Sequence, residues 1–188
     1  MKRIALLGVG ENPYITMLFE GIEKSGDQPV AVRDHDCIQG FDAACCWSMK
    51  KHTFLNKVRQ AKCPVLVAEC GYLGDRTSNH RSLGWNGING EADFCNAQVP
   101  SDRMQEWLPQ MKPWKTSGEY ILLCGQVLGD YTLRRLHKKL SVFYAHLAKQ
   151  LMEAYNLPVI FRPHPLYDCK DMPSWVERSV NKSIQDDL

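Results

Sequence analysis

Residues 159–167 are Val-Ile-Phe-Arg-Pro-His-Pro-Leu-Tyr, a short apolar run that stops at two prolines. The run Val159–Phe161 predicts a buried strand of a parallel sheet, and the prolines fix the backbone that follows it. Arg162 and His164 are then held at the carboxyl end of the strand, where open α/β sheets bind ligands. A guanidinium can grip a phosphate with two hydrogen bonds and an imidazole can donate another, so the stretch predicts a phosphate site. A proline-rich surface loop without a ligand is the alternative, and the residues alone favour neither.

The residues before this stretch predict a partner strand at Tyr120–Cys124. The turn Gly125-Gln126-Val127-Leu128-Gly129-Asp130 follows it, and the longest helix of the chain comes next, ending near Asn156. The buried stripe of this helix consists of apolar residues at helical spacing, namely Leu133, Leu136, Leu140, Phe143, Leu147 and Leu151. Because strands that flank a crossover helix run parallel, the 125–130 turn and the 162–165 motif are expected at one edge of one sheet.

The first half of the chain shows the same alternation of strands and helices. Strands are predicted at 3–9, 29–32, 41–47 and 64–68, and helices around 15–22 and 54–61. We therefore predict an α/β protein of two Rossmann-like units, 1–112 and 119–188, with parallel sheets flanked by helices and a linker at 113–118. The turn around Gly10 lacks the third glycine of a GxGxxG fingerprint, but its N–H groups at a helix start can hold a polar ligand.

Residues 71–94 lack helical or strand periodicity, yet they contain tryptophan, tyrosine and phenylalanine, which disordered segments tend to lack. We expect an ordered loop that lines a ligand site. Its ionisable groups are Glu69, at the end of the fourth strand, and Asp75, Arg76 and His80. Each of them could act as a general base or bind substrate, although a solvated loop position is the commoner role of any single one.

Composition narrows the class of protein. The net charge is +2, so the whole-molecule charge does not indicate a nucleic-acid partner, and the basic runs Lys50–Lys62 and Arg134–Lys139 are typical of solvated helix faces. The eight cysteines form no CxxC pair and no zinc-ligand spacing, so we expect reduced thiols and no metal. No signal-peptide pattern and no bilayer-spanning apolar run is present, and a cytoplasmic protein is expected.

The ordered pair of Gly125–Asp130 and Arg162-Pro163-His164-Pro165 resembles the donor-side half of GT-B glycosyltransferases. The group it looks most like is that of capsule-polysaccharide and related bacterial and phage transferases. The segments 69–76 and 82–87 resemble the acceptor-domain loop of phage glycosyltransferases.

This resemblance implies a GT-B-like enzyme with a nucleotide sugar as co-substrate, no other cofactor and no metal. The donor-binding residues it implies are Gly125, Gln126, Asp130, Arg162 and His164. On the acceptor side, the expected substrate-binding residues are Gly10, Arg76, Trp85 and Asn86. The catalytic base is expected among Asp75, Glu69 and His80, and the two carboxylates rank first because they lie nearer the strand end.

Two strands cannot bury the long leucine stripe by themselves, so the second unit is expected to be incomplete. A continuation beyond Leu188, packing on the first sheet, or a second copy in a homo-oligomer would complete it. The acceptor is expected to be a surface glycan or a modified base in DNA, and DNA would need a basic surface such as Lys50, Lys51, Lys57, Arg59 and Lys62.

Two other functions remain open at this point. One is a binding module for a nucleotide or nucleotide sugar, derived from a transferase but without catalysis. The other is a nucleoside deoxyribosyltransferase-like or flavodoxin-like hydrolase, which fits the first unit but leaves the 162–165 motif unexplained.

Overall fold

The structure is a computed structural model that describes residues 1–71, 81–94, 102–105, 107–111, 113, 116–136 and 139–180. The chain forms two compact units, Met1–Arg103 and Met104–Leu188, and the division falls upstream of the predicted linker. Within the described residues, no helix combines the length and the apolar character that crossing a membrane requires. The predicted α/β class with parallel sheets and flanking helices is confirmed.

The first unit is built on a five-stranded sheet in the order β2-β1-β3-β4-β5. Its strands are β1 (Arg3–Leu7), β2 (Gln28–Val32), β3 (Ala43–Trp47), β4 (Val65–Cys70) and β5 (Arg81–Trp85). The first four run parallel, and β5 pairs antiparallel with β4. The chain starts in the middle at β1, passes to β2 on one side, and then crosses to β3 on the other. This reversal places a topological switch point between β1 and β3, where ligands of such sheets bind.

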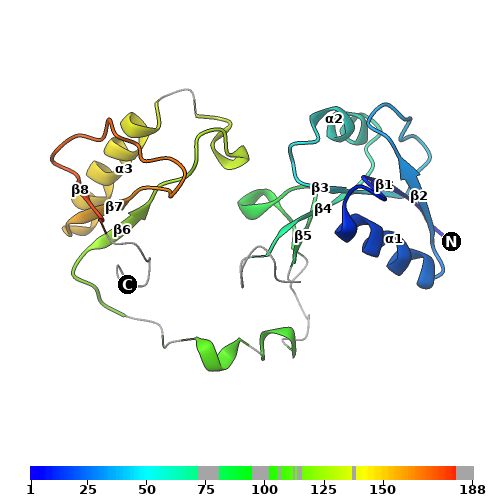
Figure 1. The fold of residues 1–188 in the computed structure, drawn as a ribbon, viewed down its shortest axis with the longest axis horizontal. Coiled ribbons are helices and arrows are strands. Elements are labelled where there is room, and N and C mark those ends of the chain that lie inside the picture. Colours follow the sequence, from blue (N-terminus) through cyan, green and yellow to red (C-terminus); the bar gives the residue numbers. More distant parts are fainter. Residues whose placement is uncertain are drawn as a thin grey trace. The chain divides into compact units, whose positions relative to one another are not determined.

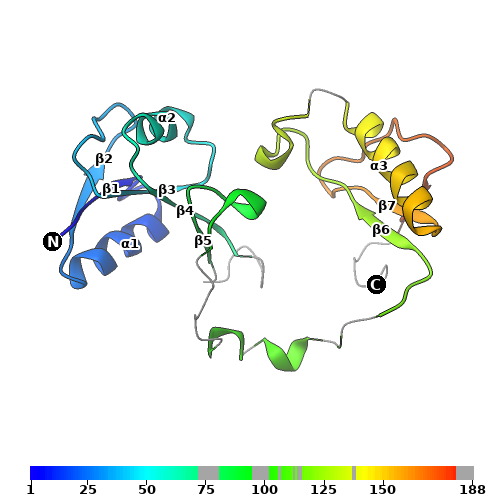
Figure 2. The same ribbon diagram turned by 180° about the vertical axis from the view of Figure 1, so that it is seen from behind.

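Two helices cover opposite faces of this sheet, α1 (Pro13–Lys24) and α2 (His52–Gln60), as Figures 1 and 2 show from both sides. Helix α1 begins at Asn12, whose side chain accepts hydrogen bonds from the N–H groups of Tyr14 and Ile15, and it ends at Ser25. Strand residues alternate between the two faces, so Leu6, Cys45 and Ala68 pack with Ile15 of α1. The opposite helix buries Phe54, Leu55 and Val58.

Strand β5 was not expected from the sequence, because residues 71–94 were predicted to be a loop. The glycine in its middle interrupts the apolar pattern for a packing reason. A Cβ atom at Gly84 would lie 2.6 Å from the Cβ of Ala92 and 2.7 Å from the carbonyl oxygen of Gly87. Gly84 therefore allows the chain after β5 to fold back closely on the strand, with a bridge between Trp85 and Asp93.

The second unit holds a parallel three-stranded sheet of β6 (Ile121–Cys124), β7 (Val159–Arg162) and β8 (Glu177–Arg178), with β7 in the middle. Helix α3 (Leu140–Tyr155) packs on one face, where Tyr144 and Ala148 join Val159 and Phe161 in the core. It ends at Asn156, which adopts the left-handed conformation with φ 52°, as the sequence indicated.

Three sequence-based expectations about helices are corrected by the structure. The long helix starts at Leu140 and not at Leu133, which lies in the 3-10 helix η4 (Tyr131–Leu133). The sequence also suggests a short helix over 102–111 and a last amphipathic stretch from Pro173. Residues 102–111 instead contain η2 (Asp102–Met104) and η3 (Leu108–Gln110), in keeping with Pro109, which cannot donate an interior helical hydrogen bond. The stretch from Pro173 contributes the strand β8. A further 3-10 helix, η1 (Asn89–Glu91), follows β5.

Candidate functional site

The predicted phosphate motif lines a pocket of about 350 Å³ at the carboxyl end of β7. Its lining residues are Arg162, Pro163, His164, Pro165, Asp168, Ser179 and Val180. They come from two neighbouring parallel strands and from the loop between them, because Ser179 and Val180 directly follow β8. The sequence did not point to Asp168 or Ser179. Recognising 177–178 as a strand parallel to β7 would have placed Ser179 at this edge.

A backbone hydrogen bond fixes the orientation and tautomer of the His164 imidazole. Its Nδ1 atom accepts from the N–H of Leu166 at 3.0 Å. A neutral imidazole has one acceptor and one donor nitrogen, so the proton of neutral His164 resides on Nε2. The turn is closed by the N–H of Tyr167, which donates to the carbonyl of His164 at 2.8 Å. The motif therefore presents an Nε2–H donor on a rigid turn.

The guanidinium of Arg162 is positioned by β8. Its Nη1 atom donates to the hydroxyl of Ser179 at 3.4 Å, and the Ser179 N–H donates to the carbonyl of Phe161 at 2.9 Å. The arginine is half-buried, so part of its planar fork is shielded from water and held at the strand end. Such a fork matches the geometry of two phosphate or carboxylate oxygens.

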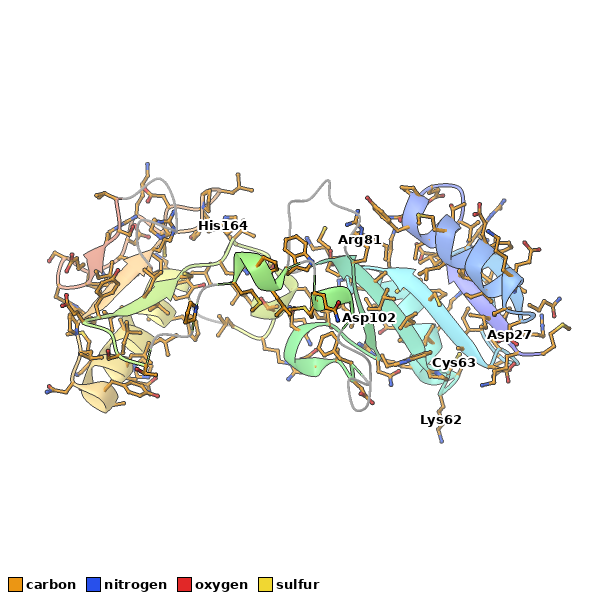
Figure 3. All side chains as sticks on the ribbon, turned by 90° about the horizontal axis from the view of Figure 1, so that it is seen from below. Asp27, Lys62, Cys63, Arg81, Asp102 and His164 are labelled. Carbon is orange, nitrogen blue, oxygen red and sulfur yellow. The ribbon has the colours of Figure 1, made fainter. Side chains whose placement is uncertain are left out.

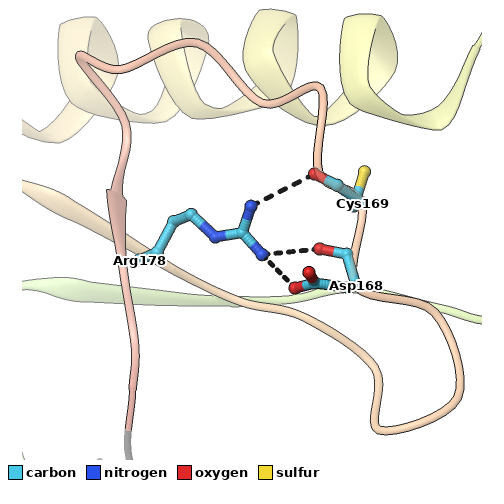
Figure 4. Close-up of polar contacts among 3 residues, drawn as sticks. All are labelled: Asp168, Cys169 and Arg178. Atoms are coloured by element: carbon cyan, nitrogen blue, oxygen red, sulfur yellow. Dashed lines mark hydrogen bonds and ion pairs between the residues drawn. The ribbon is translucent and has the colours of Figure 1, made fainter.

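An ion pair between β8 and the preceding loop compensates the carboxylate that lines the pocket. Arg178 of β8 pairs with the Asp168 carboxylate and also donates to the carbonyls of Asp168, at 2.6 Å, and Cys169, at 3.3 Å (Figure 4). The Arg178 side chain is 29% exposed and the Asp168 side chain 54%, so the pair is partly accessible to solvent. With Asp168 paired in this way, Arg162 contributes positive charge to the lining of the pocket, and positive charge favours an anion.

The predicted turn at 125–130 adjoins the motif through the backbone. The N–H of Gly125 donates to the carbonyl of Arg162 at 2.7 Å, and a Cβ atom on Gly125 would lie 2.8 Å from the ring of Phe161. The next N–H, of Gln126, donates to the hydroxyl of Tyr144 at 2.8 Å. Burial raises the pKa of that phenol, which keeps it protonated. Glycine at 125 and tyrosine at 144 therefore hold this turn against β7.

The side chains of this turn are engaged locally. The Gln126 side-chain oxygen accepts from the N–H of Val127 at 3.1 Å. Asp130 caps η4 by accepting from the N–H of Thr132 at 2.8 Å and from the hydroxyl of the same threonine. Two of the expected donor-binding residues thus shape the turn, and neither lines the 350 Å³ pocket.

In the first unit, Gly10 and Glu69 lie at the carboxyl edge of the sheet. Gly10 has a φ of 81°, which favours glycine, and its N–H donates to the hydroxyl of Thr16 at 3.0 Å. Glu69 is half-buried, and its carboxylate accepts from the N–H of Cys70 at 3.1 Å. Strand alternation directs Glu69 to the face that α2 covers. The other expected catalytic and binding residues of this loop, Asp75, Arg76 and His80, lie outside the described residues.

The structure separates Trp85 and Asn86 from Gly10 and Glu69. Because β5 runs antiparallel to β4, its end lies at the amino edge of the sheet, and Trp85 pairs with Leu66. Asn86 exchanges two hydrogen bonds with Val65, since its N–H donates to the Val65 carbonyl at 2.6 Å and its side-chain oxygen accepts from the Val65 N–H at 3.1 Å. Asn86 therefore extends the pairing of the sheet at the edge opposite to the switch point.

One cluster at the carboxyl edge of this sheet was missed in the sequence. The Arg81 guanidinium carbon lies 3.5 Å from the ring centroid of Tyr14, and that ring stacks on Trp47 at 5.4 Å. Within the described part of the chain, no group of three or more His, Cys, Asp or Glu side chains could hold a metal ion.

No family model matches this chain, and no curated protein matches it. The solved structures that share its fold include two of Thermosulfurimonas dismutans KpsC. The structure described as a beta Kdo 2,4 transferase aligns with a TM-score of 0.54 and 16% sequence identity, over 95% of this chain and 68% of the other. The beta Kdo 2,7 transferase aligns with a TM-score of 0.51 and 14% identity, over 97% of this chain and 68% of the other. The chain thus has the fold of known glycosyltransferase structures across both units.

Proposed function

We propose that this protein is a glycosyltransferase of the GT-B kind, which transfers a sugar from a nucleotide sugar to an acceptor hydroxyl. The observation that carries the proposal is the pocket at the end of β7, where the Arg162 fork and the Nε2–H of His164 face one cavity in a chain with this fold. Kdo, the sugar named for both structural relatives, is the first sugar to test.

In this proposal, the phosphate of the nucleotide leaving group binds to Arg162 and His164. Negative charge grows on the leaving oxygen as the bond to the sugar carbon breaks, and fixed donors lower the energy of that state. This electrostatic role makes a metal ion unnecessary. The acceptor hydroxyl also needs a base, and Glu69, Asp75 and His80 of the first unit are our candidates. The enzyme would act in the cytoplasm.

The test is ligand binding followed by turnover. Isothermal titration of the full chain with CMP, UDP and their sugars, including the activated form of Kdo, should show binding by at least one of them. Arg162→Gln should weaken that binding about 10-fold or more, because a charge-assisted hydrogen bond is lost. Arg59→Gln, which removes an exposed arginine of the first unit, is the matched control and should bind like the wild type.

Three outcomes of the titrations and of the turnover assay that follows them separate the possible functions. Binding of a nucleotide sugar with transfer to a glycan or to hydroxymethyl-pyrimidine DNA supports the enzyme. Binding without transfer to any acceptor favours the alternative, a nucleotide-sugar binding module. Equal binding by the wild type and Arg162→Gln would refute the assignment of the pocket.

A further inference from the structure

Three planar side chains from distant parts of the sequence gather on one face of the first sheet. The guanidinium of Arg81 lies over the ring of Tyr14, at 3.5 Å from its centroid, and 5.9 Å from the ring centroid of Trp47. The two rings are stacked, with centroids 5.4 Å apart and an interplanar angle of 24°. All three residues are half-buried, so each keeps part of its surface accessible to a ligand.

The position of this cluster in the fold is the one where open α/β sheets bind ligands. Tyr14 lies in the first turn of α1, directly after the loop that leaves β1, and Trp47 is the last residue of β3. These two strands flank the switch point of the sheet. Arg81 pairs with Cys70 at the carboxyl end of β4, and Figure 3 shows it on the side of the sheet where α1 begins.

The chemistry of the cluster suits an anionic sugar. A guanidinium that stacks on a ring directs its N–H groups sideways in its own plane, where they can meet two oxygens of a carboxylate or phosphate. The neighbouring aromatic faces offer apolar surface on which the carbon side of a sugar ring can rest.

We propose that Arg81, Tyr14 and Trp47 form a subsite that binds an acceptor sugar carrying a carboxylate or a phosphate. The acceptor role rests on the proposed glycosyl transfer, whereas the preference for an anionic sugar can be measured without any donor. The subsite belongs to the first unit, whereas the pocket at β7, which we propose for the leaving group, belongs to the second unit.

The experiment compares three small probes on the full chain by NMR titration. They are methyl β-D-glucuronide, glucose 6-phosphate and methyl β-D-glucoside, which share the sugar ring and differ in charge. The wild type should bind at least one anionic probe about 10-fold more tightly than the neutral glucoside, because a charge-assisted pair is gained. Whichever of the two anionic probes, the glucuronide or the glucose 6-phosphate, binds more tightly identifies the anion that the subsite takes.

Substitutions assign the preference to the cluster. Arg81→Gln should bind all three probes with equal, weak affinity. Arg3→Gln is the matched control, because Arg3 also lies over an aromatic ring, 4.7 Å from the centroid of Phe41, but at the amino end of β1. It should keep the wild-type preference. Equal binding of the three probes by the wild type, or an anion preference retained in Arg81→Gln, would overturn the proposal.

A second measurement does not depend on the folding of the Arg81 variant. The indole N–H signal that disappears in Trp47→Phe identifies Trp47, and the anionic probe should shift this signal in the wild type. A shift confined to other indoles would also overturn the subsite. If the wild type shows no anion preference but still binds a nucleotide sugar, only this inference is refuted. An anion preference without any nucleotide-sugar binding refutes only the proposed donor pocket and the acceptor role that depends on it.

Discussion

Two substitutions of His164 separate the two tasks of its imidazole. Asparagine places an amide oxygen near the position of Nδ1, so it can still accept from the Leu166 N–H, but it has no donor at the position of Nε2. Glutamine reaches further and can place an amide N–H near the position of Nε2, but it has no acceptor at the position of Nδ1 for the Leu166 N–H. His164→Asn thus keeps the turn and loses the ligand contact, and His164→Gln does the reverse.

The expected magnitudes differ for affinity and stability. A hydrogen bond to a charged phosphate contributes about 1.5–3 kcal/mol, so His164→Asn should weaken nucleotide-sugar binding by about 10- to 100-fold with little change in thermal stability. The bond between neutral groups in the turn contributes about 0.5–1.5 kcal/mol, which His164→Gln should lose from the free energy of unfolding. Its affinity should stay within a few-fold of the wild type.

Isothermal titration measures the affinities, and urea unfolding measures the stabilities of the same preparations. Wild-type affinity in His164→Asn would show that Nε2–H does not touch the ligand. An equal loss of affinity in both variants would show that His164 acts only by shaping the turn. Either result would refute the reasoning from the tautomer.

Three further predictions concern groups that hold the structure around the sites. Tyr144→Phe should raise the KM for the donor several-fold at nearly constant kcat, because the N–H of Gln126 in the turn at 125–130 loses its acceptor. An unchanged KM in steady-state kinetics would contradict this role. Gly125→Ala should lower the free energy of unfolding, measured in urea titrations, by about 1–3 kcal/mol, because the new methyl group meets the buried ring of Phe161. A variant as stable as the wild type would show that the ring can move aside. Burial raises the pKa of Cys46 to about 12, so this thiol should resist iodoacetamide at pH 8 while the exposed Cys37 reacts. Peptide mass spectrometry measures the labelling of each thiol. Similar labelling of both would contradict the burial of Cys46.

The sequence predicted β7 and the turn that follows it because these signals are local. The strand at Val159–Phe161, the two prolines and the histidine stand within seven residues, and their backbone conformation follows from proline itself. The sequence placed Gly125 in a turn after the partner strand, but it did not indicate the ring of Phe161 that packs against this glycine. What local signals could not reveal was β8, a strand of only two residues whose existence depends on pairing with β7.

Errors in the first unit have a common physical origin in the antiparallel strand β5. A glycine-rich stretch without periodicity was read as a loop, although Gly84 serves close packing inside a strand. The direction of that strand then decides which residues reach the switch point. It brings Arg81 to the carboxyl edge and moves Trp85 and Asn86 to the amino edge, and no periodicity of a five-residue strand encodes its direction.

The two candidate sites therefore differ in how far the sequence can specify them. Arg162 and His164 are neighbours in the chain, so their chemistry is visible as a motif. The cluster at the first sheet needs the end of β3, the start of α1 and the start of β5 to meet, and each contributes a single side chain. In the proposed function, the pocket at β7 takes a leaving-group phosphate, whose chemistry is the same for every sugar, so a short motif suffices to bind it. An acceptor differs from one enzyme to the next, and recognition assembled from separate elements allows each contact to change without disturbing the pocket at β7.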